Sequence, residues 1–143
     1  MLANNEIGTI QPITDIGNLL KSYGILFQAE LKMSISDIKF NGETAERLPG
    51  ILSITFPDAS GESVMHLLDL KGICVSTGSA CYSGKDEPSH VLLAIGLTEQ
   101  QAKSSIRISY GRYNTKEDVK IIASALCGVC EKIATTKMAG REQ

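Results

Sequence analysis

The sequence predicts an α/β domain. Short apolar runs, which are typical of strands, alternate along the chain with longer segments. In these longer segments the apolar residues recur at helical spacing. This alternation is typical of α/β folds. A length of 143 residues and a hydrophobic content of 43% suit one ordinary globular domain. We find no internal repeat and no low-complexity segment.

The first predicted elements are a helix and a strand. Residues 13–20 carry apolar side chains at helical spacing, and Thr14 is a suitable N-cap. Residues 25–27 form an apolar run that predicts a short buried strand. The pattern over residues 30–38 is irregular and predicts no regular element.

The middle of the chain predicts strand, helix and strand. Residues 51–56 are rich in Ile and Leu, and a Pro-Gly pair precedes them while Pro57 follows. Residues 62–70 have the apolar spacing of a helix, which Gly72 ends. Residues 73–75 predict a strand that leads directly into a loop of small residues.

The last third predicts two helices around one strand. Pro88 marks the start of a short helix over residues 90–95. Residues 105–110 alternate, which places Ile106 and Ile108 on one face of a strand and Arg107 on the other. A capping sequence at Thr115 begins a final helix that runs through residue 133.

Charge and hydropathy exclude several classes of function. A formal net charge of −2 without clustered Lys or Arg argues against binding to nucleic acid or to a membrane surface. No apolar run approaches the ~20 residues of a membrane span. The first residues lack the basic start and apolar core of a signal peptide. We therefore expect a cytoplasmic protein whose four cysteines are reduced thiols.

The loop over residues 76–84 contains the strongest candidate for a reactive side chain. Cys81 lies there among Ser, Thr, Gly and Ala residues, and Gly78 and Gly84 permit backbone conformations that other residues resist. Such surroundings suit a thiol that must be partly exposed to act as a nucleophile. The alternative is a buried loop cysteine without reactivity.

A second cysteine motif lies inside the last predicted helix. Cys127 and Cys130 have the Cys-x-x-Cys spacing of a redox pair or of half a zinc site. A zinc site needs two further ligands, and the sequence holds no second paired motif, so we predict no metal site. The favoured interpretation is that both cysteines are small core residues on one apolar face of the helix.

Four motifs together resemble a known family. From residue 49 to about residue 133 the chain resembles the C-terminal small domain of the PLP-dependent cysteine desulfurases, the NifS/IscS-like group of the class V aminotransferases. The cysteine loop is similar to that of the IscS-like branch. The motifs are Leu48–Ser53, Ser76–Cys81, Glu87–Leu92 and Ser104–Arg112.

Residues 2–30 resemble part of the large cofactor domain of the same family. The resemblance implies that Asn5 contacts PLP and the substrate, and that Glu30 ends a strand as the acid partner of the pyridine nitrogen. It also implies a remnant of the large PLP-binding domain over residues 1–30. Residues 31–143 would then form the small domain of a PLP-dependent type I aminotransferase-like fold.

The Schiff-base segment of the family has no counterpart in this sequence. Family members carry a Ser-x-His-Lys segment, but the histidines here are His66 and His90, and no lysine follows either of them. The chain therefore resembles an internally truncated desulfurase. We expect it to be inactive as an isolated chain, and the sequence leaves open whether it is an enzyme.

The resemblance implies sulfur transfer from L-cysteine. PLP would loosen the sulfur of the substrate, Cys81 would accept it as a persulfide, and Arg107 would bind the substrate carboxylate. Implied partners are a sulfur acceptor or scaffold protein in iron–sulfur cluster assembly or thiolation. A second copy or a full-length desulfurase is a further implied partner. The alternatives are a non-catalytic module that docks on a desulfurase or sulfur acceptor, and a dithiol or metal protein.

Overall fold

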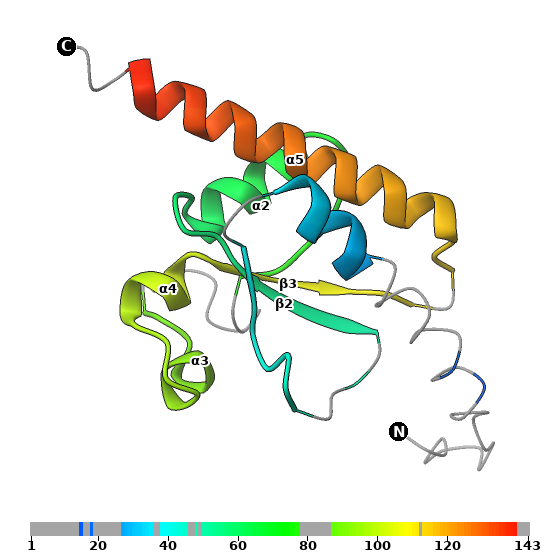
Figure 1. The fold of residues 1–143 in the computed structure, drawn as a ribbon, viewed down its shortest axis with the longest axis horizontal. Helices are drawn as coiled ribbons and strands as arrows, with labels where there is room; N and C mark the ends of the chain where they lie inside the picture. Colours follow the sequence, from blue (N-terminus) through cyan, green and yellow to red (C-terminus); the bar gives the residue numbers. More distant parts are fainter. Residues whose placement is uncertain are drawn as a thin grey trace.

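A computed structural model describes residues 15, 18, 27–35, 38–45, 48, 50–77, 87–111 and 113–139. These residues form a mixed α/β structure, as predicted, with an antiparallel sheet of strand order β1-β2-β3 (Figure 1). The strands are β1 (Lys39–Phe40), β2 (Ile51–Thr55) and β3 (Ser105–Ser109). The helices are residues 27–34, α2 (Gly61–Asp69), α3 (His90–Ala94), α4 (Glu99–Lys103) and α5 (Lys116–Ala139).

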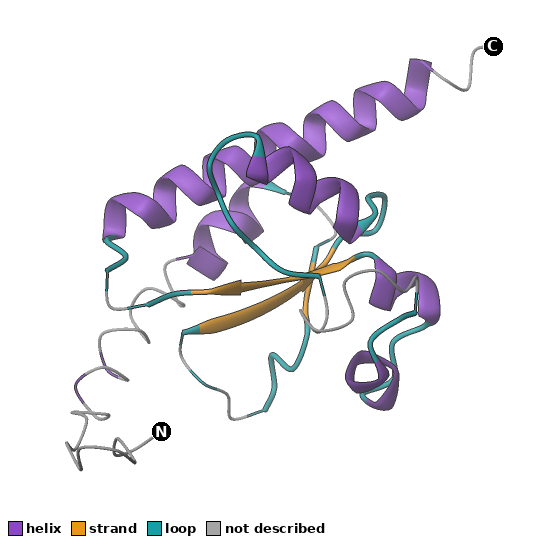
Figure 2. Cartoon of the chain, turned by 180° about the vertical axis from the view of Figure 1, so that it is seen from behind, coloured by secondary structure: helices purple, strands orange, loops and turns teal. Residues whose placement is uncertain are grey.

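One face of the sheet carries the hydrophobic core. Leu52 pairs with Ile108 and Ile54 pairs with Ile106, and all four side chains are buried. The helix over residues 27–34, α2 and α5 lie on one side of the sheet, while α3 and α4 lie beside its end (Figure 2). Leu68 of α2 and Leu126 of α5 are fully buried in the same core. The alternation of side chains along each strand thus directs the apolar residues toward the helices.

The opposite face of the sheet is polar. Ser53 pairs with Arg107 and Thr55 pairs with Ser105. These pairs alternate along the strands with the apolar pairs of the core face. None of the three larger helices lies on that side (Figure 2). Ser53 and Arg107 are half-buried on this face, whereas Thr55 and Ser105 are buried.

The helix over residues 27–34 differs from the prediction. A strand was expected at Phe27 and an irregular segment from residue 30 onward, but these residues are helical. Phe27 and Leu31 are one helical turn apart and fully buried, and Phe27 packs edge-to-face on Tyr110 at 5.6 Å between ring centroids. Burial of both side chains on one core favours the helix over the strand that the local apolar run suggested.

That helix also crosses the predicted domain boundary between residues 30 and 31. Its side chains at positions 27 and 31 enter one core together with those of β2, β3 and α5. Most of residues 1–30 lie outside the described residues, so the assignment of that segment to a remnant of a large domain stays a prediction. The same holds for the helix predicted over residues 13–20, of which the structure describes Asp15 and Asn18 as helical.

Three other differences concern short elements. Residues 73–75 form no strand, and Ser76 makes an isolated antiparallel bridge to Arg107 instead. The sequence pattern predicted no helix at α4, although Thr98 and Gln101 form a capping box at its start. It also missed β1, which is two residues long. Elements this short carry too little periodicity to be recognised.

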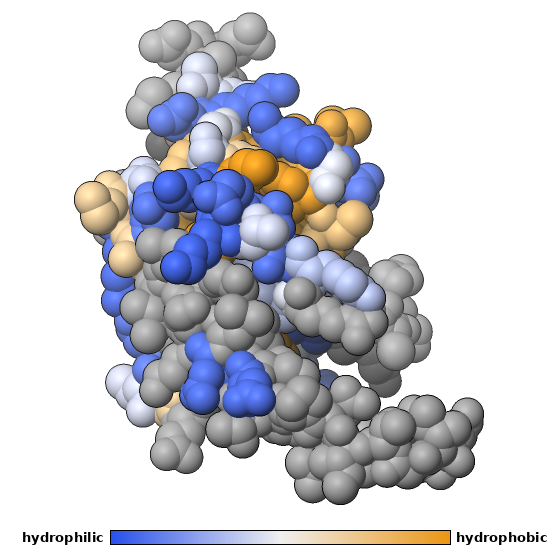
Figure 3. Space-filling view, turned by 90° about the vertical axis from the view of Figure 1, so that its right-hand side faces the viewer, coloured by the Kyte–Doolittle hydropathy of each residue, from blue (hydrophilic) through white to orange (hydrophobic). Residues whose placement is uncertain are grey.

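Some large hydrophobic side chains are exposed at the surface of the described part of the chain. Seen from the side, a small area of hydrophobic residues is bordered by hydrophilic ones (Figure 3). Met33, Leu70 and Tyr113 are 81–87% exposed, and Val91 of α3 and Ile121 of α5 are 56–59% exposed. The described part of the chain therefore encloses most of its apolar side chains in the core between helices and sheet.

Close packing between α2 and β3 depends on Gly61. A Cβ atom at this position would lie 2.6 Å from the backbone oxygen of Ser105 and 3.0 Å from that of Lys103. We expect Gly61→Ala to lower the free energy of unfolding by about 1–3 kcal/mol, because backbone must shift to make room. Urea unfolding would measure this loss. Gly128→Ala is the matched control, since a Cβ atom there meets no atom within 4 Å; an equal loss in both variants would contradict the packing argument.

Candidate functional site

A polar network organises the open face of the sheet. The Asn41 side chain donates a hydrogen bond from Nδ2 to Ser53 Oγ at 3.0 Å and accepts one at Oδ1 from Thr55 Oγ1 at 3.0 Å. The hydroxyls of Thr55 and Ser105 lie 2.7 Å apart. These contacts satisfy polar side chains that the strands place next to one another. They also fix the neighbours of Arg107 on this face.

Arg107 lies at the centre of β3 on this face. Its side chain is half-buried, and its backbone exchanges two hydrogen bonds with Ser76, with N···O distances of 3.0 and 2.6 Å. The ion pairs found among the described residues are Lys32 with Glu43 and His66 with Glu62, so no carboxylate in this part of the chain pairs with Arg107. A guanidinium without a carboxylate partner can bind the carboxylate of a ligand through two parallel hydrogen bonds.

The cysteine loop begins beside this arginine. Cys81 lies outside the described residues, but Ser76, from which its loop starts, is bridged to Arg107. Cys81 follows Ser76 by five residues, which span at most about 18 Å when fully extended. The bridge therefore supports the prediction that Cys81 and Arg107 belong to one site, and the reactivity of Cys81 stays a prediction.

Of the two predicted cofactor contacts, the structure describes only Glu30. Asn5 lies outside the described residues. Glu30 is half-buried on the helix over residues 27–34, between Phe27 and Leu31, and not at the end of a strand as predicted. This helix packs on the apolar face of the sheet, whereas Arg107 lies on the polar face.

The described residues consequently do not fit PLP as the resemblance implied. One cofactor molecule with its substrate would have to contact both Glu30 and Arg107, but the sheet and its core separate them. Neighbouring residues on a strand point to opposite faces, so side-chain rotation alone cannot bring the two groups together. We therefore assign no cofactor role to Glu30 within this fold.

The other cysteines have distinct surroundings. Cys74 is exposed, and Cys127 and Cys130 are half-buried on α5. Burial, with smaller contributions from Cys127 and Glu131, raises the pKa of Cys130 to about 11. Among the described residues, no group of three or more His, Cys, Asp or Glu side chains is placed to hold a metal ion.

The hydrogen-bonded polar residues on the face of Arg107 were not predicted from the sequence. Ser53 and Thr55 alternate with Leu52 and Ile54 along β2, and this period of two could have assigned them to the face opposite the core. The partnership with Asn41 could not have been found in this way, because the sequence alone does not give the register between β1 and β2.

No helix in the described part of the chain is both long and apolar enough to cross a membrane. The fold and the site together define an α/β domain that holds helices on one face of an antiparallel sheet. On the open face it presents an arginine with no carboxylate partner among the described residues.

Comparison with known proteins assigns this domain to a family. The class-V aminotransferase family model matches residues 28–122. The cysteine desulfurase IscS of Dictyoglomus turgidum is 44% identical over 109 residues, which are 76% of this chain and 28% of that protein. The IscS protein of Methanosarcina thermophila is 38% identical over 128 residues, which are 90% of this chain and 31% of that protein.

A solved structure agrees with these relatives. A NifS-like protein from Rickettsia africae has a TM-score of 0.72 at 29% identity, covering 83% of this chain and 30% of that one. The chain belongs to the class-V aminotransferase family, and it resembles the IscS and NifS-like proteins. It spans less than a third of the length of these relatives.

Proposed function

We propose that this chain takes part in sulfur transfer from L-cysteine, with Cys81 as the persulfide carrier and Arg107 as the carboxylate-binding residue. The observation that supports this most is the bridge between Ser76 and Arg107, which starts the cysteine loop beside an arginine without a carboxylate partner in the described residues. The relatives named cysteine desulfurase IscS support the same chemistry.

The transfer itself needs one nucleophilic step on Cys81. Its thiolate attacks the outer sulfur of a persulfide donor such as L-cysteine persulfide, and a new S–S bond forms on Cys81. The S–S bond of the donor breaks, and L-cysteine leaves as a thiolate that takes up a proton. Arg107 would hold the donor carboxylate during this step, so that the outer sulfur lies within reach of the loop.

In the cell, we propose that PLP chemistry on L-cysteine supplies this sulfur and that these 143 residues do not bind the cofactor by themselves. Glu30 lies on a helix at the apolar face of the sheet and Arg107 lies on the polar face, which supports the proposal that the cofactor binds elsewhere. A reducing cytoplasm would keep Cys81 a thiol. A sulfur acceptor or scaffold protein of iron–sulfur cluster assembly or thiolation would receive the sulfur, and a second copy or a full-length desulfurase would supply the cofactor-dependent step.

Mass spectrometry of the chain after exposure to L-cysteine persulfide tests this proposal. We expect one added sulfur atom on the peptide that contains Cys81 and complete loss of this product in Cys81→Ala. Cys74→Ala is the matched control because Cys74 is the exposed cysteine of the described residues; this variant should keep the product. A product that survives in Cys81→Ala and disappears in Cys74→Ala would contradict the proposal.

The alternative function is a non-catalytic module that docks on a desulfurase or sulfur acceptor. Two exposed apolar side chains shortly after the cysteine loop favour it: Val91 of α3, which is 56% exposed, and Ile95 directly after α3, which is 54% exposed. A stable complex with an IscS-type desulfurase in which Cys81 gains no sulfur while that desulfurase turns over L-cysteine would select this alternative over sulfur transfer.

A further inference from the structure

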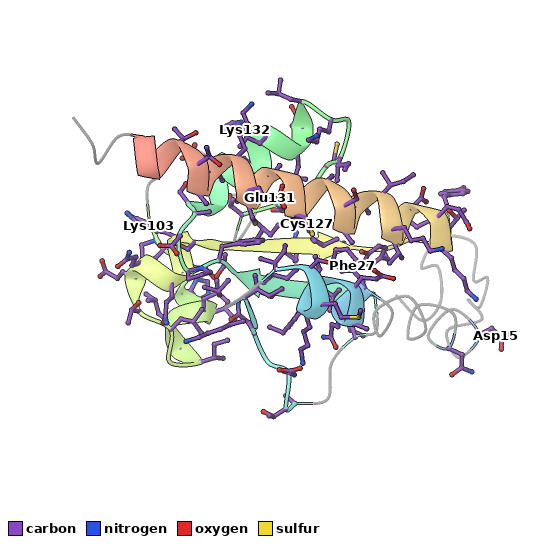
Figure 4. All side chains as sticks on the ribbon, turned by 45° about the horizontal axis from the view of Figure 1, so that its top comes forward. Asp15, Phe27, Lys103, Cys127, Glu131 and Lys132 are labelled. Carbon is purple, nitrogen blue, oxygen red and sulfur yellow. The ribbon has the colours of Figure 1, made fainter. Side chains whose placement is uncertain are left out.

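The cysteine pair of α5 lines a cavity that the proposed function does not use. Cys127 and Cys130 border a space of about 230 Å³ between α5, the end of the helix over residues 27–34 and the segment that follows β2. Cys127 and Glu131 lie one turn apart on α5 (Figure 4). Other lining residues include Ser34, Ile35, Phe56, Asp58, Ala59 and Glu131.

Helix geometry brings the two thiols close to disulfide distance. Residues three apart on an α-helix have Cα atoms about 5 Å apart, within the range of about 4.4–6.8 Å seen in disulfides. Their Cβ atoms are about 5–6 Å apart, which exceeds the ~3.5–4.5 Å of a disulfide. A bond between Cys127 and Cys130 therefore requires a small local change in the helical backbone.

Gly128 makes such a change easier. It lies between the two cysteines in the interior of α5, it is exposed, and a Cβ atom there would meet no atom within 4 Å. Close packing therefore gives no reason for glycine at this position, although glycine disfavours a helix relative to alanine. Its backbone freedom allows the helix to unwind locally between the thiols.

We propose that Cys127 and Cys130 form a dithiol site that reacts with small cationic disulfides and closes into a disulfide within α5. The charge of the cavity identifies this class of reactant. The carboxylate of Glu131 is on the cavity lining, and no Lys or Arg is among the lining residues. A cationic disulfide such as cystamine is therefore attracted, and an anionic one such as oxidised glutathione is repelled.

The reaction proceeds in two exchange steps. Because burial raises the pKa of Cys130 to about 11, this residue stays a thiol, and the Cys127 thiolate attacks the small disulfide first and releases one small thiolate. Cys130 then loses its proton to water and attacks the sulfur of Cys127, which releases the second small thiolate. The pair loses two electrons and two protons, and the small disulfide is reduced to two thiols.

The experiment uses the full chain with Cys74→Ser and Cys81→Ser, so that the pair alone carries thiols. Cystamine and oxidised glutathione are added separately at equal ionic strength, and products are followed by mass spectrometry. We expect an internal disulfide with loss of two hydrogens, formed faster with cystamine than with oxidised glutathione. Cys130→Ser should stop the reaction at a mixed disulfide on Cys127.

Gly128→Ala tests the role of the backbone. Alanine should hold the helix more firmly and lower the ratio of closed disulfide to mixed disulfide about fivefold. Mixed disulfides on both cysteines without an internal bond would overturn the proposal. So would complete resistance of both thiols to cystamine in the folded chain. This proposal involves neither Cys81 nor Arg107, so its outcome is independent of the persulfide test.

Discussion

Arg107→Ala should lower the rate of sulfur transfer from L-cysteine persulfide to Cys81 by about 10- to 150-fold. The loss follows from removing hydrogen bonds to a charged group, which contribute about 1.5–3 kcal/mol. In the wild type Arg107 is half-buried and its guanidinium has no carboxylate partner among the described residues, so a donor carboxylate can bind it without displacing another carboxylate. The measurement is the rate at which the persulfide forms on Cys81.

The donor provides the matched control for this prediction. Cysteamine persulfide has the same reacting sulfur atoms and lacks the carboxylate, so Arg107→Ala should leave its transfer rate unchanged. Arg107→Lys should fall between wild type and Arg107→Ala, because lysine keeps the charge but cannot form two parallel hydrogen bonds. Equal losses with both donors would mean that Arg107 acts on the loop and not on the carboxylate.

The second large effect concerns the core under α5. Leu126→Ala should lower the free energy of unfolding by about 2–5 kcal/mol, because it removes a fully buried side chain and leaves a cavity between α5 and the sheet. Domains of this size are stable by only about 5–15 kcal/mol. The loss would therefore be a large part of the total, and urea unfolding would measure it.

Ile121→Ala on the same helix is the control for that measurement. Ile121 is 59% exposed, so its truncation should change the free energy of unfolding by no more than about 0.5 kcal/mol. A loss in Ile121→Ala as large as that in Leu126→Ala would show that α5 is stabilised by helix formation itself and not by packing on the sheet.

The sequence predicted best the elements with strong periodicity. The helix predicted over residues 62–70 is α2 at Gly61–Asp69, and the final helix was found from its cap, although it extends past residue 133 to Ala139. The strand over residues 105–110 was found with its two faces, which placed Arg107 opposite Ile106 and Ile108 correctly. Alternation on a half-buried strand carries this information in the sequence itself.

The errors arose where tertiary packing decided the structure. Phe27 follows two apolar residues and locally resembles a strand, yet its contact with Tyr110 and the burial of Leu31 favour a helix. The resemblance to a cofactor-domain strand led to the same error at Glu30. The bridge from Ser76 to Arg107 was not predictable, because it joins segments about thirty residues apart through backbone atoms alone.

The most direct test of the account is sulfide release from L-cysteine by this chain with added PLP and reductant, compared with Cys81→Ala. We propose that these residues carry the sulfur-accepting part of a desulfurase and do not form its cofactor site. The account predicts no sulfide release above that of Cys81→Ala, while Cys81 still accepts sulfur from a preformed persulfide. Release that depends on Cys81 would contradict the claim, because it would require a cofactor site on these residues.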